Sequence, residues 1–154
     1  MRQRQGMDPT VQNECIKRQT LIRLDMRIDV FSICDFAQDN NNKLTIVGTY
    51  NRIMSRVFPL TFNQIMVALR LSFFPSEIGD KHFSCSILDP TDNVVAGPIS
   101  GTINVGEVNE LSTVSPILSF YNVVFNEAGH YSVSFNLDGT VYSTDLILSQ
   151  LINQ

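Results

Sequence analysis

The sequence predicts a single all-β domain, an immunoglobulin-like antiparallel β-sandwich of about eight strands. From Met26 onward, apolar and polar residues alternate with a period of two, which is the side-chain period of a half-buried strand. Gly, Pro, Asn and Asp separate the alternating runs at spacings of about 8–12 residues, as they do in sandwiches and barrels. The chain has 154 residues, which fits one domain of the usual ~100–200 residues. We therefore expect the sandwich to occupy residues 26–154.

The predicted strands can be placed in order along this region. Residues 28–36 form the first strand, and residues 44–50 form the second, after a loop of turn-forming residues at 37–43. The later strands cover residues 65–74, 82–88, 94–105 (in short pieces broken by Gly97-Pro98 and Gly101), 118–125, 130–137 and 140–149. We expect residues 53–59 to be a connection, and we allow one turn of helix at 105–114.

The long strand at residues 65–74 predicts part of the core. Its odd-numbered positions are apolar without exception from Ile65 to Phe73, whereas its even-numbered positions are mixed. Successive side chains of a strand point to opposite faces. We therefore expect Val67, Leu69 and Leu71 to be buried and Arg70 to reach solvent.

The last two strands give the most specific prediction. Asp138-Gly139 lies between two alternating runs and is typical of a two-residue type I′ turn, in which both residues have positive φ. With this turn, Leu137 pairs with Thr140, and Phe135 pairs with Tyr142. The predicted register places the aromatic and β-branched residues of both strands on the core face.

Tyr131 begins the first of these two strands, directly after Ala128-Gly129-His130. This arrangement is similar to the tyrosine corner of immunoglobulin-like sandwiches, in which the hydroxyl bonds backbone a few residues upstream. We expect an architectural role for Tyr131, not a catalytic one.

The N-terminal segment differs from the rest in charge. Residues 1–27 carry six basic and three acidic side chains, whereas residues 28–154 carry five basic and twelve acidic ones. We predict that residues 1–25 are a poorly ordered tail, with translation starting at Met1, Met7 or Met26. The acidic body argues against nucleic acid as a partner, because nucleic-acid binders gather Lys and Arg.

The cysteines and the hydropathy indicate a cytoplasmic protein. Cys15, Cys34 and Cys85 are odd in number, and no two of them have the C-x-x-C spacing of a zinc site. The N-terminus lacks the apolar core of a secretory signal, and no apolar stretch reaches the ~18–20 residues that span a membrane. We expect reduced thiols; a Cys34–Cys85 disulfide would require export.

The candidate catalytic groups have structural interpretations that we favour. His82 and His130 each begin a strand, and neither lies in a nucleophile motif. Asp35 lies within a strand, where its carboxylate would either cap the adjoining loop or line a polar pocket. We therefore assign no catalytic residue.

Two loops carry groups of the kind that bind ligands. Asp39-Asn40-Asn41-Asn42 offers oxygen ligands, but it lacks the spacing of a calcium loop, and a hairpin turn explains it. Residues 97–101 (Gly-Pro-Ile-Ser-Gly) lack the G-K-[ST] and the helix of a phosphate loop. We assign no metal-binding or cofactor-binding residue and no cofactor.

Two segments resemble a known family. The stretch CDFAQDNNNKLTIVGTY at 34–50 and the stretch AGHYSVSFNLDG at 128–139 are similar to segments of short bacterial proteins that are classified only as a domain of unknown function. In that family a polar hairpin leads into a K-L-[TS]-I-x-G strand. The resemblance covers roughly residues 26–149, implies a bacterial source and supports the sandwich, but it implies no site residue.

We predict a non-enzymatic binding or structural module that acts through contact with an unidentified protein, with its oligomeric state left open. One alternative is a small-ligand or carbohydrate binder that uses loop aromatics such as Tyr50 and Phe74. The other is an enzyme whose carboxylates converge in space but not in sequence. A deep pocket with carboxylates of perturbed pKa would favour the enzyme, and an exposed apolar patch would favour the interaction module.

Overall fold

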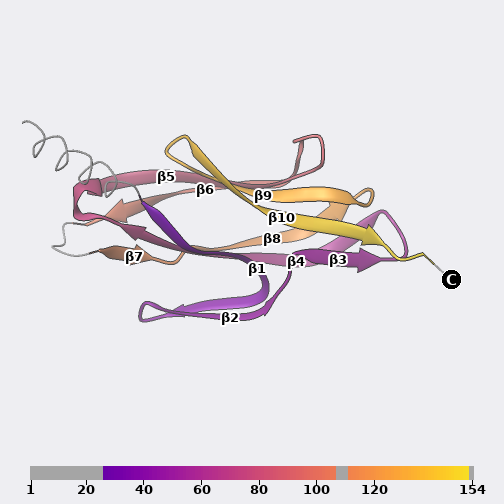
Figure 1. Ribbon diagram of the computed structural model, residues 1–154, viewed down its shortest axis with the longest axis horizontal. Coiled ribbons are helices and arrows are strands. Elements are labelled where there is room, and N and C mark those ends of the chain that lie inside the picture. The colour runs from indigo at the N-terminus through magenta and orange to yellow at the C-terminus, as the bar shows by residue number, and fades with distance from the viewer. Residues whose placement is uncertain (1–25, 107–110, 153–154) are drawn as a thin grey trace, which may run out of the picture.

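Two β-sheets of five strands each lie face to face in the computed structural model, which describes residues 26–106 and 111–152 (Figure 1). The first sheet contains β1 (Arg27–Asn40), β2 (Lys43–Thr49), β4 (Leu60–Phe73), β7 (Ser112–Val114) and β8 (Ile117–Phe125). The second sheet contains β3 (Arg52–Ser55), β5 (Gly79–Leu88), β6 (Val94–Val105), β9 (Gly129–Leu137) and β10 (Thr140–Gln150). A short 3₁₀ turn, η1 (Pro75–Glu77), joins β4 to β5. The predicted all-β sandwich is confirmed.

The strand count and one strand direction differ from the prediction. The described residues contain ten strands, not eight, because β3 and β7 are only four and three residues long and show too little periodicity to be recognised. β3 lies where we expected a connection, and it pairs with β10 in parallel, so the sandwich is not purely antiparallel. β6 runs continuously through Gly97-Pro98 and Gly101 where we expected short pieces. We expected a helical turn at 105–114. The described residues of this range form no helix, and the range ends in β7.

The order of strands is β2-β1-β4-β7 in the first sheet, with β8 also paired to β4, and β3-β10-β9-β5-β6 in the second. β7 and β8 follow one another along the same edge of β4, where Pro116 accepts the backbone N–H of Leu69 at 2.9 Å. Consequently β2, β3, β6, β7 and β8 each have one edge that no other described strand pairs with, and β1, β4 and β10 are unpaired on one side over part of their length.

The register of the β9–β10 hairpin is confirmed residue by residue. Leu137 pairs with Thr140 and Phe135 with Tyr142, and the ladder continues without a shift to the pair of Gly129 with Leu148. Asp138 and Gly139 have φ values of +46° and +89°, as a type I′ turn requires. The alternation of apolar and polar residues and the turn residues therefore specify the same pairing.

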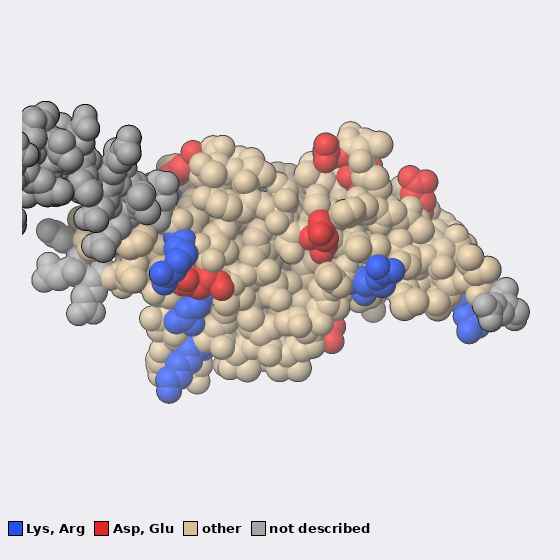
Figure 2. Space-filling view, in the orientation of Figure 1, with Lys and Arg blue, Asp and Glu red and all other residues tan. Residues whose placement is uncertain are grey.

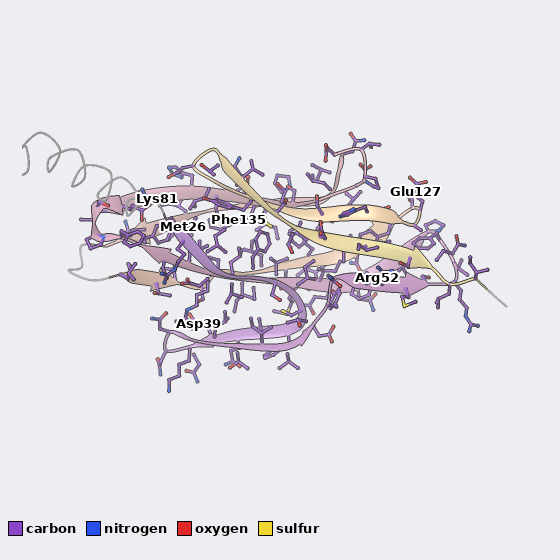
Figure 3. All side chains as sticks on the ribbon, in the orientation of Figure 1. Met26, Asp39, Arg52, Lys81, Glu127 and Phe135 are labelled. Atoms are coloured by element: carbon purple, nitrogen blue, oxygen red, sulfur yellow. The ribbon has the colours of Figure 1, made fainter. Side chains whose placement is uncertain are left out.

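The core lies between the two sheets. Val67, Leu69 and Leu71 are fully buried, as predicted from the alternation along β4. Phe135 points from β9 into the space between the sheets (Figure 3), where its ring meets Phe31 edge-on at 6.3 Å and stacks on Phe83 at 5.9 Å. Such aromatic pairs add about 0.5–1.5 kcal/mol each beyond the area they bury.

The tyrosine corner is confirmed. Tyr131 is buried, and its hydroxyl donates a hydrogen bond of 2.9 Å to the backbone carbonyl of Glu127, four residues upstream. Its ring also meets Phe125 edge-on at 5.0 Å. The bond ties the β8–β9 connection to the core, and burial raises the pKa of the phenol.

The predicted tail at residues 1–25, which includes Cys15 and two of the possible translation starts, lies outside the described residues. No helix in the described part of the chain combines the length and apolarity needed to cross a membrane.

Candidate functional site

The β1–β2 hairpin is the part of the molecule that departs most from a flat sheet. β1 pairs with β4 from Arg27 to Cys34, and beyond Cys34 it pairs only with β2. In Figure 1 the hairpin forms a separate layer beneath the first sheet, on the side away from the second. The outer half of β1 and the whole of β2 therefore cover part of the outer face of the first sheet.

A small cluster of buried side chains holds the hairpin to this face. Cys34, Ala37 and Ala68 are buried together, outside the main core, with partly buried Ile46, Met66 and Ile117 around them. Ala37 and Ala68 have only a methyl group each, so the strands can approach closely. The outer face of β4, which alternation alone would leave to solvent, is thus covered at Ala68.

Arg70 fastens the tip of the hairpin. Its guanidinium donates a hydrogen bond of 3.2 Å to the backbone carbonyl of Asn42 in the turn. Arg70 is half-buried, so the prediction that it reaches solvent is only partly right: it points outward as expected, but the hairpin covers it. The turn residues Asn41 and Asn42 have φ values of +49° and +64°, so the asparagine run forms a tight hairpin turn, and the strands extend into the predicted 37–43 loop.

An ionic and hydrogen-bonded group lies on the same outer face. Asp29 accepts hydrogen bonds from the Ser72 hydroxyl and from the Arg27 guanidinium, the latter at 2.6 Å. The hydrogen bond from Ser72, then that from Arg27, lowers the pKa of Asp29 below its ordinary value, and the charge of Arg70 acts in the same direction. Figure 2 shows basic groups gathered beside an acidic one at this end of a mostly uncharged face.

Gly48 and Asp35 form a close contact where the hairpin leaves the sheet. Gly48 has a φ of +67°, and the place that its Cβ would occupy is taken by the carboxylate of Asp35. Asp35 is exposed and makes none of the side-chain hydrogen bonds found in the described residues, so it does not cap the loop through its amides. Its position explains the glycine that ends the K-L-T-I-V-G stretch.

The outward face of the hairpin carries an exposed apolar pair. Phe36 and Val47 are directly opposite one another in the β1–β2 ladder, and they are 47% and 54% exposed. Ala37 and Ile46, the next pair, point to the opposite side and pack against the sheet. Strict alternation along β1 would place Phe36 on the same buried face as Cys34. Phe36 is instead exposed.

The free edge of β2 has no pairing partner among the described strands. The Asn40–Lys43 pair closes a two-residue turn, and the hydrogen-bonding direction then alternates along the ladder. The backbone N–H and C=O groups of Leu44 and Ile46 consequently point away from β1. β2 has seven residues, contains no proline and has one charged residue, Lys43.

The outermost strands of the described sheets other than β2 each carry a feature that discourages pairing. β3 and β7 are short. In β6, Gly97, at φ +90°, and Pro98, which has no N–H, distort the strand where its register with β5 shifts. Asn122, at φ +52°, interrupts β8. Among the outermost strands of the two described sheets, β2 is therefore the one best suited to accept a further strand.

The predicted loop aromatics do not converge on a ligand site. Tyr50 packs against Phe62 with the ring centroids 6.1 Å apart, whereas Phe74 lies at the start of η1, where its N–H bonds Glu77 at 2.8 Å. The Tyr50 hydroxyl is buried without a hydrogen-bond partner among the described residues. Burial, reinforced by the charge of Asp35, raises the pKa of Tyr50 to about 12.

The two histidines have separate structural contacts. One ring nitrogen of His82, Nδ1, lies 3.2 Å from the Thr102 hydroxyl, at the rim of an open depression of about 540 Å³ on the outer face of the second sheet. His130 Nε2 lies 2.8 Å from a carboxylate oxygen of Asp145, and both side chains are largely exposed. Among the described residues no three His, Cys, Asp or Glu side chains gather in a way that could hold a metal ion.

The two described cysteines are free and lie in different clusters. Cys34 belongs to the cluster under the hairpin, whereas Cys85 belongs to the core between the sheets. Burial raises the pKa of both thiols, that of Cys85 to about 12. Neither thiol is suited to act as a thiolate nucleophile, and the first sheet lies between them, so they are not placed for a disulfide.

Comparisons with known proteins give one family. A sequence profile described as "Family of unknown function (DUF6941)" matches residues 29–146, more than half of the chain. No curated protein matches the chain.

Among solved structures, the chain is similar to the alkylpurine DNA glycosylase AlkC of Pseudomonas fluorescens, bound to DNA containing an abasic site analog, with 8% identity and a TM-score of 0.39. The similarity covers 91% of this chain and 35% of the glycosylase chain, so this chain spans about a third of that protein's length. A likeness this weak carries no functional argument.

Proposed function

Since the chain belongs to this family of unknown function, we propose from its own geometry that it is a non-enzymatic binding module that contacts other proteins. The binding surface is the β1–β2 hairpin, where an extended segment of a partner adds to the free edge of β2. The observation that carries the proposal is this edge, which lies next to the exposed Phe36–Val47 pair and lacks the features that discourage pairing at the other outermost strands.

The chemistry of the edge defines the kind of partner. Backbone groups of Leu44 and Ile46 would supply affinity without regard to sequence, as in other cases of strand addition. Phe36 and Val47 would select an apolar side chain at one position of the incoming segment. The hairpin is held in place by the Arg70–Asn42 bond and by the Ala37–Ala68 contact, so little ordering cost is added on binding.

The test uses peptides selected from a random library of extended segments. We expect selected peptides to protect the amides of Leu44 and Ile46 from hydrogen exchange. The double substitution Phe36→Ser with Val47→Ser should weaken binding at least about tenfold, because burying the exposed half of each side chain is worth about 1 kcal/mol.

Val141→Ser is the matched control, since Val141 is 60% exposed on β10 and lies on the other hairpin. It should leave peptide affinity unchanged. Selected peptides that protect other amides, or a library that yields no binder, would contradict the proposal.

Two further expectations belong with this proposal. We propose the cytoplasm of a bacterial cell as the location, which the free, buried thiols of Cys34 and Cys85 support. We also propose that the sandwich is immunoglobulin-like, which the Tyr131 corner supports.

The alternatives have weaker support. A small-ligand or carbohydrate site would use the open depression beside His82, which presents Ser84, Ser100 and Asn136, whereas the ring of Phe83 in its lining stacks on Phe135 in the core. An enzyme would need carboxylates that converge, and Asp138 is the single carboxylate residue lining that depression.

A further inference from the structure

We propose that the strand received by the free edge of β2 is β2 of a second copy of this chain, paired antiparallel across a two-fold axis at Thr45. This inference rests on the proposed function and deepens it, because it names the partner. It follows from the pattern of five residues, Lys43-Leu44-Thr45-Ile46-Val47, and from the backbone conformation that ends this run.

The run is complementary to itself. A two-fold axis at Thr45 places Leu44 of each copy opposite Ile46 of the other. The backbone N–H and C=O groups of these two residues are the ones that point to the free edge. Leu44 and Ile46 are both partly buried and apolar, so their new contacts are apolar as well. Thr45 faces Thr45, a pair that stabilises adjacent strands.

The charge fits the same register. Lys43 is the one charged residue of β2, and pairing about Thr45 places it opposite Val47 of the second copy. The neighbour of Val47 in its own ladder is Phe36. The stem of Lys43 can then lie along Val47 while its ammonium reaches the face of the Phe36 ring, a favourable cation–π contact. No two lysines are brought together.

Gly48 excludes the competing register whose axis lies one residue further along the chain. An axis at Ile46 would require Gly48 to pair with Leu44 of the second copy. Gly48 has a φ of +67°, in the left-handed region, and the carboxylate of Asp35 lies against it, so extended pairing ends at Val47. The axis at Thr45 uses the five extended residues before this point.

Register-specific cross-linking tests the inference. In a background with Cys15→Ser, Thr45→Cys should form an intermolecular disulfide under mild oxidation, because the two thiols face one another at the axis. Thr49→Cys is the matched control, since Thr49 is also exposed on β2 but lies outside the paired run. Cross-linking of Thr49→Cys as readily as Thr45→Cys would overturn the register.

Sedimentation equilibrium provides the second measurement. We expect wild-type chains to dimerise with rising concentration, and Thr45→Lys to raise the dissociation constant at least tenfold because like charges would meet at the axis. Thr49→Lys should leave it unchanged. Neither substitution touches a buried side chain, so thermal unfolding should remain that of the wild type.

The outcomes separate this inference from the proposed function. A monomer at all concentrations whose Leu44 and Ile46 amides are protected by selected peptides would overturn the self-pairing and leave the proposed function standing. A Thr45-centred dimer that accepts no peptide would support the self-pairing and overturn binding of other proteins. If neither a second copy nor any peptide protects these amides, both fail.

Discussion

The two hairpins β1–β2 and β9–β10 begin from similar turns and end in different places. Each has a two-residue turn with positive φ at both positions, Asn41-Asn42 in one and Asp138-Gly139 in the other. The β9–β10 hairpin stays in its sheet and keeps one register over its whole length. The β1–β2 hairpin leaves the β4 edge after Cys34 and packs on the outer face of the first sheet.

The difference teaches that turn residues set the pairing within a hairpin but not its position in the fold. β9 has β5 on its other edge over Ser132–Leu137, and β10 has β3 over Ile147–Gln150, so the hairpin is held in the plane of the sheet by both strands. β1 loses β4 as a neighbour at Cys34, and beyond it only small buried groups and the Arg70 bond determine where the hairpin lies. A hairpin held from one side in this way also keeps a free edge, which is why the proposed binding surface is found there.

The largest expected effect separates the two faces of β4. Leu69→Ala, on the core face, should lower the free energy of unfolding by about 2–5 kcal/mol, as deletion of a fully buried leucine does. Ala68→Leu, on the face under the hairpin, should cost about 1–3 kcal/mol through overpacking. Urea unfolding measures both.

Hydrogen exchange then distinguishes where the damage falls. Ala68→Leu should accelerate exchange of the β1–β2 amides while the β9–β10 amides keep their protection. Equal loss of protection in both hairpins would mean that the cluster under the β1–β2 hairpin is part of the main core.

A second comparison concerns one glycine in each hairpin. Gly139→Ala should lower the free energy of unfolding by about 1 kcal/mol. The cause is left-handed backbone strain alone, since nothing lies within 4 Å of the added methyl. Gly48→Ala should cost more, because its methyl also meets Asp35. Thermal unfolding of Gly48→Ala in an Asp35→Ala background should recover the excess. If the two glycine variants are equally stable, the Asp35 contact is not tight.

The tyrosine corner provides a smaller effect at the β9–β10 side. Tyr131→Phe should lower the free energy of unfolding by about 1 kcal/mol, because the hydroxyl of Tyr131 and the carbonyl of Glu127 lose one hydrogen bond. Tyr121→Phe, at an exposed tyrosine of β8, should leave stability unchanged. Binding through the β1–β2 hairpin should survive both substitutions.

The smallest effect is a pH dependence at the β1–β2 side. The pKa of Asp29 is lower in the folded state, so its contribution to stability is present above the unfolded pKa, near 3.8, and is lost as pH falls through the folded value. Asp29→Asn should therefore be less stable than wild type at neutral pH, with the difference shrinking below about pH 3.8.

The cause of this shift can be tested directly. Ser72→Ala should raise the pKa of Asp29 in an NMR titration, because the hydrogen bond from Ser72 is the largest cause of the lowering. An unchanged titration would show that Arg27 and Arg70 sustain the lowered pKa without Ser72.

Alternation and turn chemistry determined the fold class, the burial of Val67, Leu69 and Leu71, the Tyr131 corner and the complete β9–β10 register. These features are local: a period of two separates the faces of a strand, and positive φ at two positions fixes which residues pair. The same reasoning predicted that a hairpin turn forms in the run that contains Asn41 and Asn42.

Only the tertiary structure decided where that hairpin lies, that β3 pairs in parallel with β10, and that Phe36 and Val47 are exposed beside a free edge. The burial of Ala37 and Ala68 depends on residues 31 positions apart meeting across two layers, and no periodicity within either strand encodes such a contact. Alternation states that side chains point to opposite faces, but what covers each face depends on the rest of the chain.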